Sequence, residues 1–288
     1  MIELLVLGAG FTGVRVAREF LQREARVVVT TRTPDAIRLA GATVYPLELP
    51  GKDVLAGLRE LLRPGMLVLH SVPLIRSGGQ LQDPTPELLE TVGPFARRIV
   101  YLSTTGVYGN ARHVDQNTPV KASTPRETLR VQAERAVASG PWSWMILRPA
   151  AIYGPGRGVH QAMRQGRFQL AGDGGNFISR IHVDDLAAHT RAALLSNESG
   201  AWPVADDEPC PSAEIARFCA DLLGLPMPPA VPLDALSETR RSDRRVDGRA
   251  VRKLLGLELK HPSYRAGIPA SIAEKGTDAF SRGKNSQV

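Results

Sequence analysis

The sequence has few aromatic residues, few cysteines and no long apolar run. Aromatic residues make up 5% of the 288 residues, and Cys210 and Cys219 are its two cysteines. Neither belongs to a Cys-x-x-Cys pair, which excludes a small disulfide scaffold, and no His/Cys cluster has the spacing of metal ligands. We therefore expect two buried thiols and no metal site.

Signals for export and for membrane insertion are also missing. No apolar run approaches the roughly 18 residues that indicate a membrane span. The first ten residues, MIELLVLGAG, have neither a basic start nor a small-residue cleavage site. These absences favour a cytoplasmic chain without a membrane partner.

The charge is unbalanced toward arginine. The net charge is +7, and the tight basic group consists of Arg240, Arg241, Arg244 and Arg245. No basic run is interleaved with aromatic residues, so no nucleic-acid partner is predicted. Arginine also suits anionic small molecules, because its planar guanidinium matches the oxygens of phosphate and carboxylate groups.

Short apolar segments alternate with segments of helical spacing in the first half of the chain. Residues 2–7 are apolar, as in a strand buried on both faces, and a helix over 11–23 precedes the β-branched strand Arg26–Thr31. Further strands are expected at 43–47, 66–70, 98–102 and 144–147, and further helices at 34–40, 53–62, 84–92, 125–138, 183–195, 212–223 and 248–255. This order predicts an α/β fold, a Rossmann-type doubly wound parallel sheet with a smaller C-terminal substrate lobe.

Glycine and proline interrupt the pattern after Pro149. We therefore expect a dinucleotide-binding domain at 1–150, with contributions from 176–205. A smaller substrate-side lobe is expected at 151–272, and a flexible polar tail at 273–288.

The segment GAGFTG at 8–13 matches G-x-G-x-x-G and lies between the first strand and the first helix. In this context Gly8 permits the tight turn, Gly10 lets the backbone approach a pyrophosphate, and Gly13 lets the helix pack on the strand. The free N–H groups at the start of the helix would face the phosphates. The sequence therefore predicts a dinucleotide site here.

No carboxylate follows the second strand, where NAD sites usually carry Asp or Glu for the ribose hydroxyls. The residues in that place are Thr31, Arg32 and Thr33. Arg32 would pair with a 2′-phosphate, and the threonines would donate hydrogen bonds to it. We predict that NADP(H) is preferred over NAD(H); the alternative is a solvated surface arginine.

Three later segments resemble those of extended short-chain dehydrogenases/reductases. They are YLSTTGVYG at 101–109, LRPAAIYGPG at 147–156 and IHVDDLA at 181–187. In order and spacing, over roughly residues 1–260, the chain is similar to the NAD-dependent epimerase/dehydratase branch of that family. Within that branch it resembles the atypical subgroup.

The resemblance implies roles for the matching positions. Cofactor contacts are implied for Gly8, Gly10, Phe11, Thr12, Gly13, Thr31, Arg32, His70, Ser71, Val72, Ser103, Arg130, Pro149 and Ala150. Thr104 matches the catalytic Ser/Thr of the family. Arg180 and the arginines at 240–245, Arg244 among them, would lie where relatives hold the phosphate of a nucleotide sugar. His182, Asp184 and Asp185 are expected to brace a loop and to cap a helix.

The chain departs from the family at the Tyr-x-x-x-Lys pair. In the family, Lys lowers the pKa of the Tyr phenol so that it exchanges a proton with the substrate. Arg126 stands at the Tyr position and Arg130 at the Lys position, and no Tyr occurs between Tyr108 and Tyr153. Either of these two tyrosines is a candidate substitute for the proton donor.

Two functions follow as hypotheses. The first is an NADP(H)-dependent oxidoreductase or epimerase that acts on a sugar-like small molecule, phosphorylated or nucleotide-linked. The second is a non-catalytic NADP(H)-binding sensor or regulator, which must bind NADPH and NADP⁺ unequally. A homodimer is left open.

Overall fold

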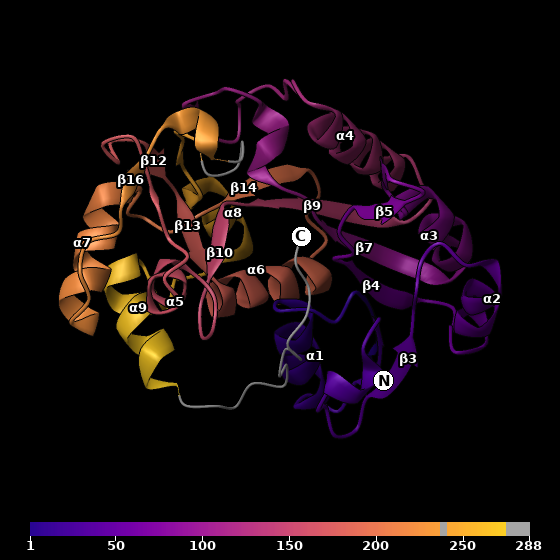
Figure 1. Cartoon of the computed structure of the whole chain (residues 1–288). Coiled ribbons are helices and arrows are strands. Elements are labelled where there is room, and N and C mark those ends of the chain that lie inside the picture. Colours follow the sequence, from indigo (N-terminus) through magenta and orange to yellow (C-terminus); the bar gives the residue numbers. More distant parts are fainter. Residues whose placement is uncertain (237–240, 275–288) are drawn as a thin grey trace.

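The computed structural model describes residues 1–236 and 241–274. Its central sheet is built from β1 Glu3–Leu7, β2 Arg26–Thr31, β3 Thr43–Pro46, β4 Met66–His70, β7 Ala96–Leu102, β9 Ser143–Pro149 and β14 Ala201–Val204. All neighbouring strands are parallel, and their order is β14-β9-β7-β4-β1-β2-β3 (Figure 1). The predicted doubly wound α/β fold is confirmed.

Helices cover both faces of this sheet. On one face lie α1 Gly13–Leu21, α6 Val183–Leu195 and α8 Arg249–Leu255, and on the other lie α2 Lys52–Glu60, α3 Thr85–Val92 and α4 Pro125–Ala138. The helices α5 Val159–Arg164, α7 Ser212–Leu223 and α9 Tyr264–Ala273 lie away from the sheet. Residues along a strand alternate between the two faces. Leu4 and Val6 of β1 therefore pack under α1, α6 and α8, while Leu5 and Leu7 pack under α2, α3 and α4.

Shorter elements connect and extend these layers. The short strands are β5 Ile75–Ser77, β6 Gln80–Gln82, β8 His113–Val114, β10 Ala151–Tyr153, β11 Leu170–Ala171, β12 Phe177–Ile178, β13 Arg180–His182, β15 Cys210–Pro211, β16 Ala230–Val231 and β17 Arg245–Val246. The 3-10 turns are Pro34–Ala36, Gly93–Phe95, Thr105–Tyr108 and Leu233–Ala235.

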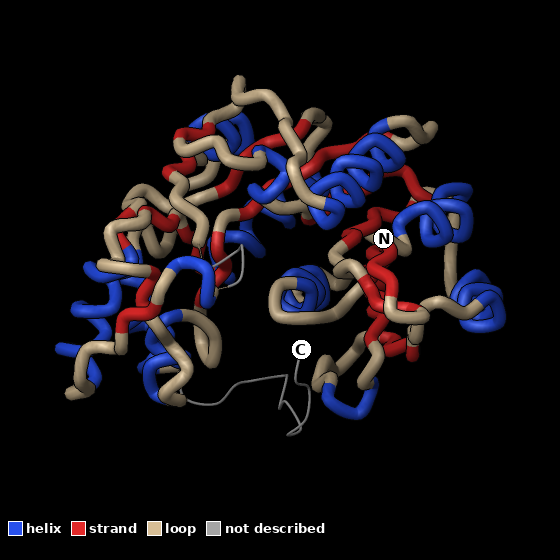
Figure 2. Tube along the Cα trace, turned by 45° about the horizontal axis from the view of Figure 1, so that its top comes forward, coloured by secondary structure: helices blue, strands red, loops and turns tan. Residues whose placement is uncertain are grey.

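A second core lies away from the sheet. It is formed where α5, α7 and α9 pack together, and both views place these helices at the opposite side of the molecule from β3 (Figures 1 and 2). Its buried members include Tyr153, Ile215, Tyr264 and Ile268, together with the thiol of Cys219. Cys210 is also buried, so both cysteines are the buried free thiols that the sequence indicated.

The sequence prediction was wrong at 34–40, where a helix was expected. Only the 3-10 turn Pro34–Ala36 forms there. Ile37 and Leu39 are buried and Arg38 is exposed. This alternation belongs to extended chain, and it lets both apolar side chains reach the core under α1.

The expected tail and part of the basic group fall largely outside the described residues. Residues 275–288 and Arg240 are not described, and the proposed domain boundaries stay predictions. No helix in the described part of the chain is long and apolar enough to span a membrane.

The start of α6 ties the sheet to the chain that leads into α9. Asp185 is 2% exposed, and its two carboxylate oxygens accept the N–H groups of Lys260 at 2.7 Å and His261 at 3.0 Å. Both backbone N–H groups depend on this one side chain, so its loss would leave them without a hydrogen-bond acceptor.

We expect Asp185→Ala to lower the free energy of unfolding by about 1–3 kcal/mol, and Asp185→Asn to lower it less because one acceptor remains. Urea denaturation of the three proteins measures this. An alanine variant as stable as the native chain would show that the two N–H groups find other partners.

Candidate active site

The order of the sheet reverses between β1 and β4. Doubly wound sheets bind ligands in a crevice at the carboxyl ends of the strands at such a point, so the ligand crevice is expected here. The glycine turn at this edge is held by hydroxyl groups from two strands. Thr30 Oγ1 accepts the N–H of Gly8 at 3.0 Å, and Ser71 Oγ donates to the carbonyl of Gly8 at 2.7 Å. Gly8 has a φ of +86°, and a Cβ there would lie 3.1 Å from the carbonyl carbon of Ser71. The turn therefore requires glycine.

The front of the same turn is open and suited to an anion. A Cβ at Gly13 would lie 2.7 Å from the Gly8 oxygen, whereas a Cβ at Gly10 would meet no atom within 4 Å. Helix α1 begins after Thr12 and has no acidic residue in its first turn. The guanidinium of Arg15 lies over the Phe11 ring, 4.7 Å from its centroid. Free N–H groups and this positive charge fit the phosphates of a dinucleotide.

Arg32 extends this edge beyond β2. Thr31 is buried and its Oγ1 accepts the N–H of Thr33 at 3.2 Å. Arg32 is exposed and makes no contact with a charged or polar partner among the described residues. Its guanidinium is available to a bound anion, although its predicted role stays a prediction.

His70 is the buried end of a hydrogen-bonded chain behind β4. Its Nδ1 accepts the N–H of Val72, so its Nε2 donates to Thr85 Oγ1 at 2.8 Å, and that hydroxyl donates to Asp83 Oδ1. Burial, with a contribution from Arg130, lowers the pKa of His70 to about 3. His70 is therefore neutral at pH 7 and shapes the crevice through Val72 without entering it.

The two arginines of α4 lie in different surroundings. Arg126 is exposed, while Arg130 is 7% exposed and donates through Nη1 to the hydroxyl of Tyr101. The same Nη1 lies 3.6 Å from Asp83 Oδ2, a buried ion pair. Nη1 of Arg130 is thus anchored, and Nε and Nη2 have no partner among the described residues.

A second buried network joins α4 to β9. Arg148 donates to Glu134 through Nε at 3.0 Å and through Nη2 at 2.6 Å, and Ser103 Oγ donates to the same carboxylate. Arg148 Nη1 donates to the hydroxyl of Tyr108 at 3.1 Å. Burial opposes the charge of Arg148, but the bonds to Glu134 outweigh it and raise the pKa of Arg148.

The expected proton donors are shut inside the protein. Tyr108 is 1% exposed, and burial raises the pKa of its phenol despite Arg148. Tyr153 is 3% exposed, donates to the carbonyl of Ser263, and has a pKa raised by burial. The Tyr108 hydroxyl is held by Arg148, and the Tyr153 hydroxyl is turned onto the carbonyl of Ser263. A catalytic role for Tyr108 therefore stays a prediction without geometric support.

Thr104 lies at the edge itself. It is half-buried and follows β7, and its Oγ1 accepts the N–H of Gly106 at 3.1 Å, which leaves the hydroxyl proton to donate. Pro149 ends the neighbouring β9, and Ala150 follows it. These residues and Ser103 therefore lie at the carboxyl ends of neighbouring strands, and their contacts with a cofactor stay predictions.

The two arginines expected at the substrate are placed differently. Arg244 donates from Nε, Nη1 and Nη2 to the carbonyls of Ala111, Thr105 and Gly109, so it clamps the 105–111 loop. Arg180 is 4% exposed and lines a cavity beyond β10. The predicted phosphate contact of Arg244 has no geometric support.

A cluster that sequence reasoning missed lies at the start of α6. Asp184 Oδ2 lies 3.8 Å from His182 Nδ1 and 3.9 Å from His261 Nε2, an arrangement with the residue types of a metal site. Asp184 is also paired with Arg15 at 3.0 Å and Lys260 at 3.5 Å. These cations disfavour a metal ion, and His182 Nδ1 already caps the helix by accepting the N–H of Asp184. The bracing role expected for this segment is confirmed.

Comparison with known proteins decides the family. The family model described as NAD dependent epimerase/dehydratase matches residues 73–204. A solved structure of a functionally unknown conserved protein from Silicibacter pomeroyi is 32% identical, covers 95% of this chain and 99% of that chain, and has a TM-score of 0.77. The chain belongs to the NAD-dependent epimerase/dehydratase family. The expected resemblance is thereby confirmed.

Other similar proteins are more distant or partial matches. The UDP-glucuronic acid 4-epimerase of Bacillus cereus, solved with UDP-glucuronic acid and NAD, is 18% identical over 94% of this chain and 98% of that chain, with a TM-score of 0.76. That identity shows the fold alone. A 3-diazoavenalumate denitrifying reductase from a Streptomyces species is 32% identical over 170 residues, 54% of this chain. The match spans 55% of that relative, so the chain covers about half the length of the curated protein.

Alanine at two glycines separates packing from ligand binding. We expect Gly13→Ala to cost about 1–3 kcal/mol of stability, because its methyl group meets the Gly8 carbonyl. Gly10→Ala should keep native stability and weaken NADPH binding, because its methyl group enters the open space. Urea denaturation and NADPH titration of each variant measure the two effects; native NADPH affinity in Gly10→Ala would contradict this placement of the pyrophosphate.

The neutral state of His70 predicts a loss of stability in acid. Its folded pKa of about 3 lies below the ordinary 6.5, so the unfolded chain binds the proton more readily and stability falls as pH drops from 6.5 toward 3. Between pH 6.5 and 5 we expect His70 to contribute about 2 kcal/mol of that loss.

Denaturation at pH 7 and pH 5 tests this. His70→Gln should lose about 2 kcal/mol less than the native protein over this interval, whereas the same change at the exposed His113 should leave the pH dependence intact. Equal losses in both variants would place the acid sensitivity elsewhere.

Proposed function

We propose that this chain is an NADP(H)-dependent reductase that delivers hydride to a small molecule without a tyrosine proton donor. The observation that carries the proposal is the open glycine cradle beside an unpaired Arg32, with no carboxylate at the end of β2. The printed name of the Streptomyces relative, a reductase, supports the reaction class, and NAD in the Bacillus cereus structure supports the cofactor class.

Different residues at the carboxyl edge of the sheet bind different parts of the cofactor. In this proposal the N–H groups at the start of α1, in front of Gly10, hold the pyrophosphate, and Arg32 pairs with the 2′-phosphate. Ser71, Val72, Ser103, Pro149 and Ala150 line the path to the nicotinamide. A reduced nicotinamide supplies hydride when it is bound.

Arg130 takes over one role of the family lysine, the binding of the nicotinamide ribose. Nη1 stays on Tyr101, and the remaining N–H groups donate to the nicotinamide ribose. A guanidinium keeps its proton at any working pH, so neither Arg126 nor Arg130 relays one. Arg130 therefore positions the ribose and plays no part in proton transfer.

Thr104 is the polar group that meets the reacting atom of the substrate. Its hydroxyl proton is free to donate while Gly106 fixes its oxygen. In this proposal a substrate that needs a proton after hydride arrives takes it from water, because the phenol of Tyr108 is buried against Arg148 and that of Tyr153 donates to the carbonyl of Ser263. Since general acid catalysis typically contributes about 10²–10⁴-fold, the enzyme suits substrates that are already strongly electrophilic.

We propose a small-molecule substrate and a cytoplasmic location for this enzyme, and a homodimer stays a prediction. The competing function, a cofactor sensor, is favoured by one observation, the arginines at the Tyr and Lys positions of α4. Single-turnover mixing with NADPH and a panel of electrophilic carbonyl compounds separates the two. Tight NADPH binding without NADPH oxidation across the panel would favour the sensor.

Arg32→Ala tests the cofactor preference. We expect the native chain to bind NADPH more tightly than NADH, and the variant to lose about tenfold to a hundredfold for NADPH alone, the worth of a charge-assisted hydrogen-bonded pair. Arg59→Ala, an exposed arginine on α2, is the matched control and should bind both nucleotides like the native chain.

Fluorescence titration with each nucleotide measures these affinities. Equal binding of NADPH and NADH by the native protein would contradict the role of Arg32 while leaving the site in place. Binding of neither would contradict the proposed function itself.

A further inference from the structure

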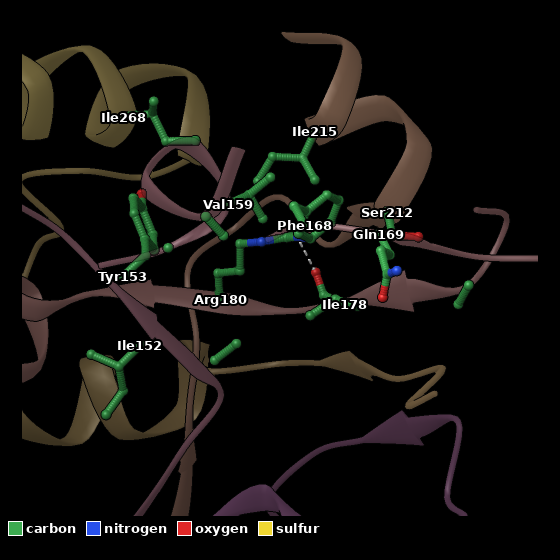
Figure 3. Close-up of a pocket in the computed structure, with 14 residues that line it drawn as sticks. Ile152, Tyr153, Val159, Phe168, Gln169, Ile178, Arg180, Ser212, Ile215 and Ile268 are labelled. Atoms are coloured by element: carbon green, nitrogen blue, oxygen red, sulfur yellow. Dashed lines mark hydrogen bonds between the residues drawn. The ribbon is translucent and has the colours of Figure 1, made fainter. Parts of the chain in front are cut away.

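The described part of the chain contains a cavity of about 220 Å³ between the end of the sheet and the second core. Its walls are apolar and come from β10, α5, β12, α7 and α9; they include Ile152, Val159, Phe168, Ile215 and Ile268 (Figure 3). Sites for drug-sized ligands are usually about 300–1,000 Å³. The cavity therefore suits a smaller molecule with an apolar body.

The cavity adjoins the place expected for the nicotinamide. Its lining begins at Ala151, the residue after Ala150, which itself follows the end of β9 at Pro149. A molecule held here would have one end toward the reacting edge of the sheet. The inference below therefore concerns the substrate of the proposed reductase and rests on that proposed function.

Arg180 is the single charged side chain among the described residues that line the cavity. It is 4% exposed and extends from β13 into the middle of the cavity (Figure 3). Its Nη1 donates to the carbonyl of Ile178 at 2.7 Å and contacts Cys210 Sγ at 3.3 Å. Its Nε and Nη2 have no partner among the described residues. Two parallel donors of the guanidinium thus remain free in an apolar cavity.

No carboxylate in the described part of the chain forms an ion pair with Arg180. The acid that acts on it electrostatically, Asp206, is 3% exposed, and its Oδ2 has no hydrogen-bond partner. Burial, against the attraction of Arg180, raises the pKa of Asp206 to about 8. Asp206 is thus mostly neutral at pH 7, and a buried guanidinium without a counter-ion is costly unless an anion joins it.

We propose that this cavity binds a small monocarboxylate with an apolar body, and that the carboxylate pairs with Nε and Nη2 of Arg180. The planar fork of a guanidinium matches the two oxygens of a carboxylate. One lining cation balances one negative charge, whereas a nucleotide diphosphate would bring more charge and more volume than the cavity holds. The apolar walls then pack against the body of the acid.

The test uses the full-length protein and two probes of nearly equal shape, trans-cinnamate and its neutral amide, cinnamamide. Isothermal titration, with and without NADP⁺, measures their dissociation constants. We expect the native chain to bind cinnamate at least about tenfold more tightly than cinnamamide, because only the anion forms the paired, charge-assisted bonds.

Variants of Arg180 test whether this side chain causes the preference for cinnamate. Arg180→Met should abolish the preference for cinnamate, and Arg180→Lys should keep a weaker preference, because an ammonium group retains charge but lacks the fork. Arg217→Met is the matched control, since Arg217 is exposed on α7, the helix that supplies Ile215 to the cavity. It should bind both probes like the native chain. NADPH affinity and the thermal midpoint of each variant establish that it is folded.

Equal binding of the two probes by the native protein would overturn the assignment, as would a full preference for cinnamate in Arg180→Met. Absence of cinnamate binding at millimolar concentration in a chain that binds NADPH would overturn it while leaving the proposed reductase standing. Conversely, cinnamate binding that depends on Arg180 in a chain that binds no nicotinamide nucleotide would support the cavity and contradict the reductase. If Arg180→Met does not fold, the native chain and Arg180→Lys decide the question.

Discussion

The buried ion pair between Arg148 and Glu134 fixes the reacting edge of this protein. It joins the end of β9 to α4, and through Glu134 it also holds Ser103, the residue that follows β7. Separating two buried opposite charges leaves each without compensation, which is why such a pair tolerates little movement. The position of Thr104, one residue beyond Ser103, depends on it. So does the register of α4, whose Arg130 lies one helical turn before Glu134.

Arg130 shows how the chain departs from its family while keeping the family fold. The lysine of the Tyr-x-x-x-Lys pair lowers the pKa of a phenol on the same helix face, but Arg130 is bonded to Tyr101 on β7 and paired with Asp83. Burial raises the pKa of Tyr101 to about 12, so this contact does not create a proton donor. Arg130 and Arg148 therefore keep α4 in place, and no side chain on this helix transfers a proton. This is the physical reason to expect a substrate that accepts hydride readily.

Much of the sheet domain could be predicted because its signals are local. β2, β4, α4, α6 and α7 begin and end where periodicity and capping placed them, since apolar spacing and turn residues are read over a few positions. β14 was missed because it is a short edge strand containing Pro203, and α9 because Gly267 and Pro269 interrupt its pattern. In the candidate site, too, local signals could be predicted and contacts between distant residues could not. The glycine turn was evident, whereas the free donors of Arg180 and the clamping of Arg244 on the 105–111 loop depend on residues far apart in the sequence.

A crystal structure of the chain with bound NADP⁺ would test the central claim, that this edge holds NADP(H) through arginines and without a tyrosine proton donor. The account predicts the pyrophosphate in front of Gly10, the 2′-phosphate on Arg32, and the nicotinamide beside Thr104 and Ala150, with Arg130 still bonded to Tyr101. A nicotinamide contacted by a tyrosine hydroxyl, or a 2′-phosphate away from Arg32, would contradict it.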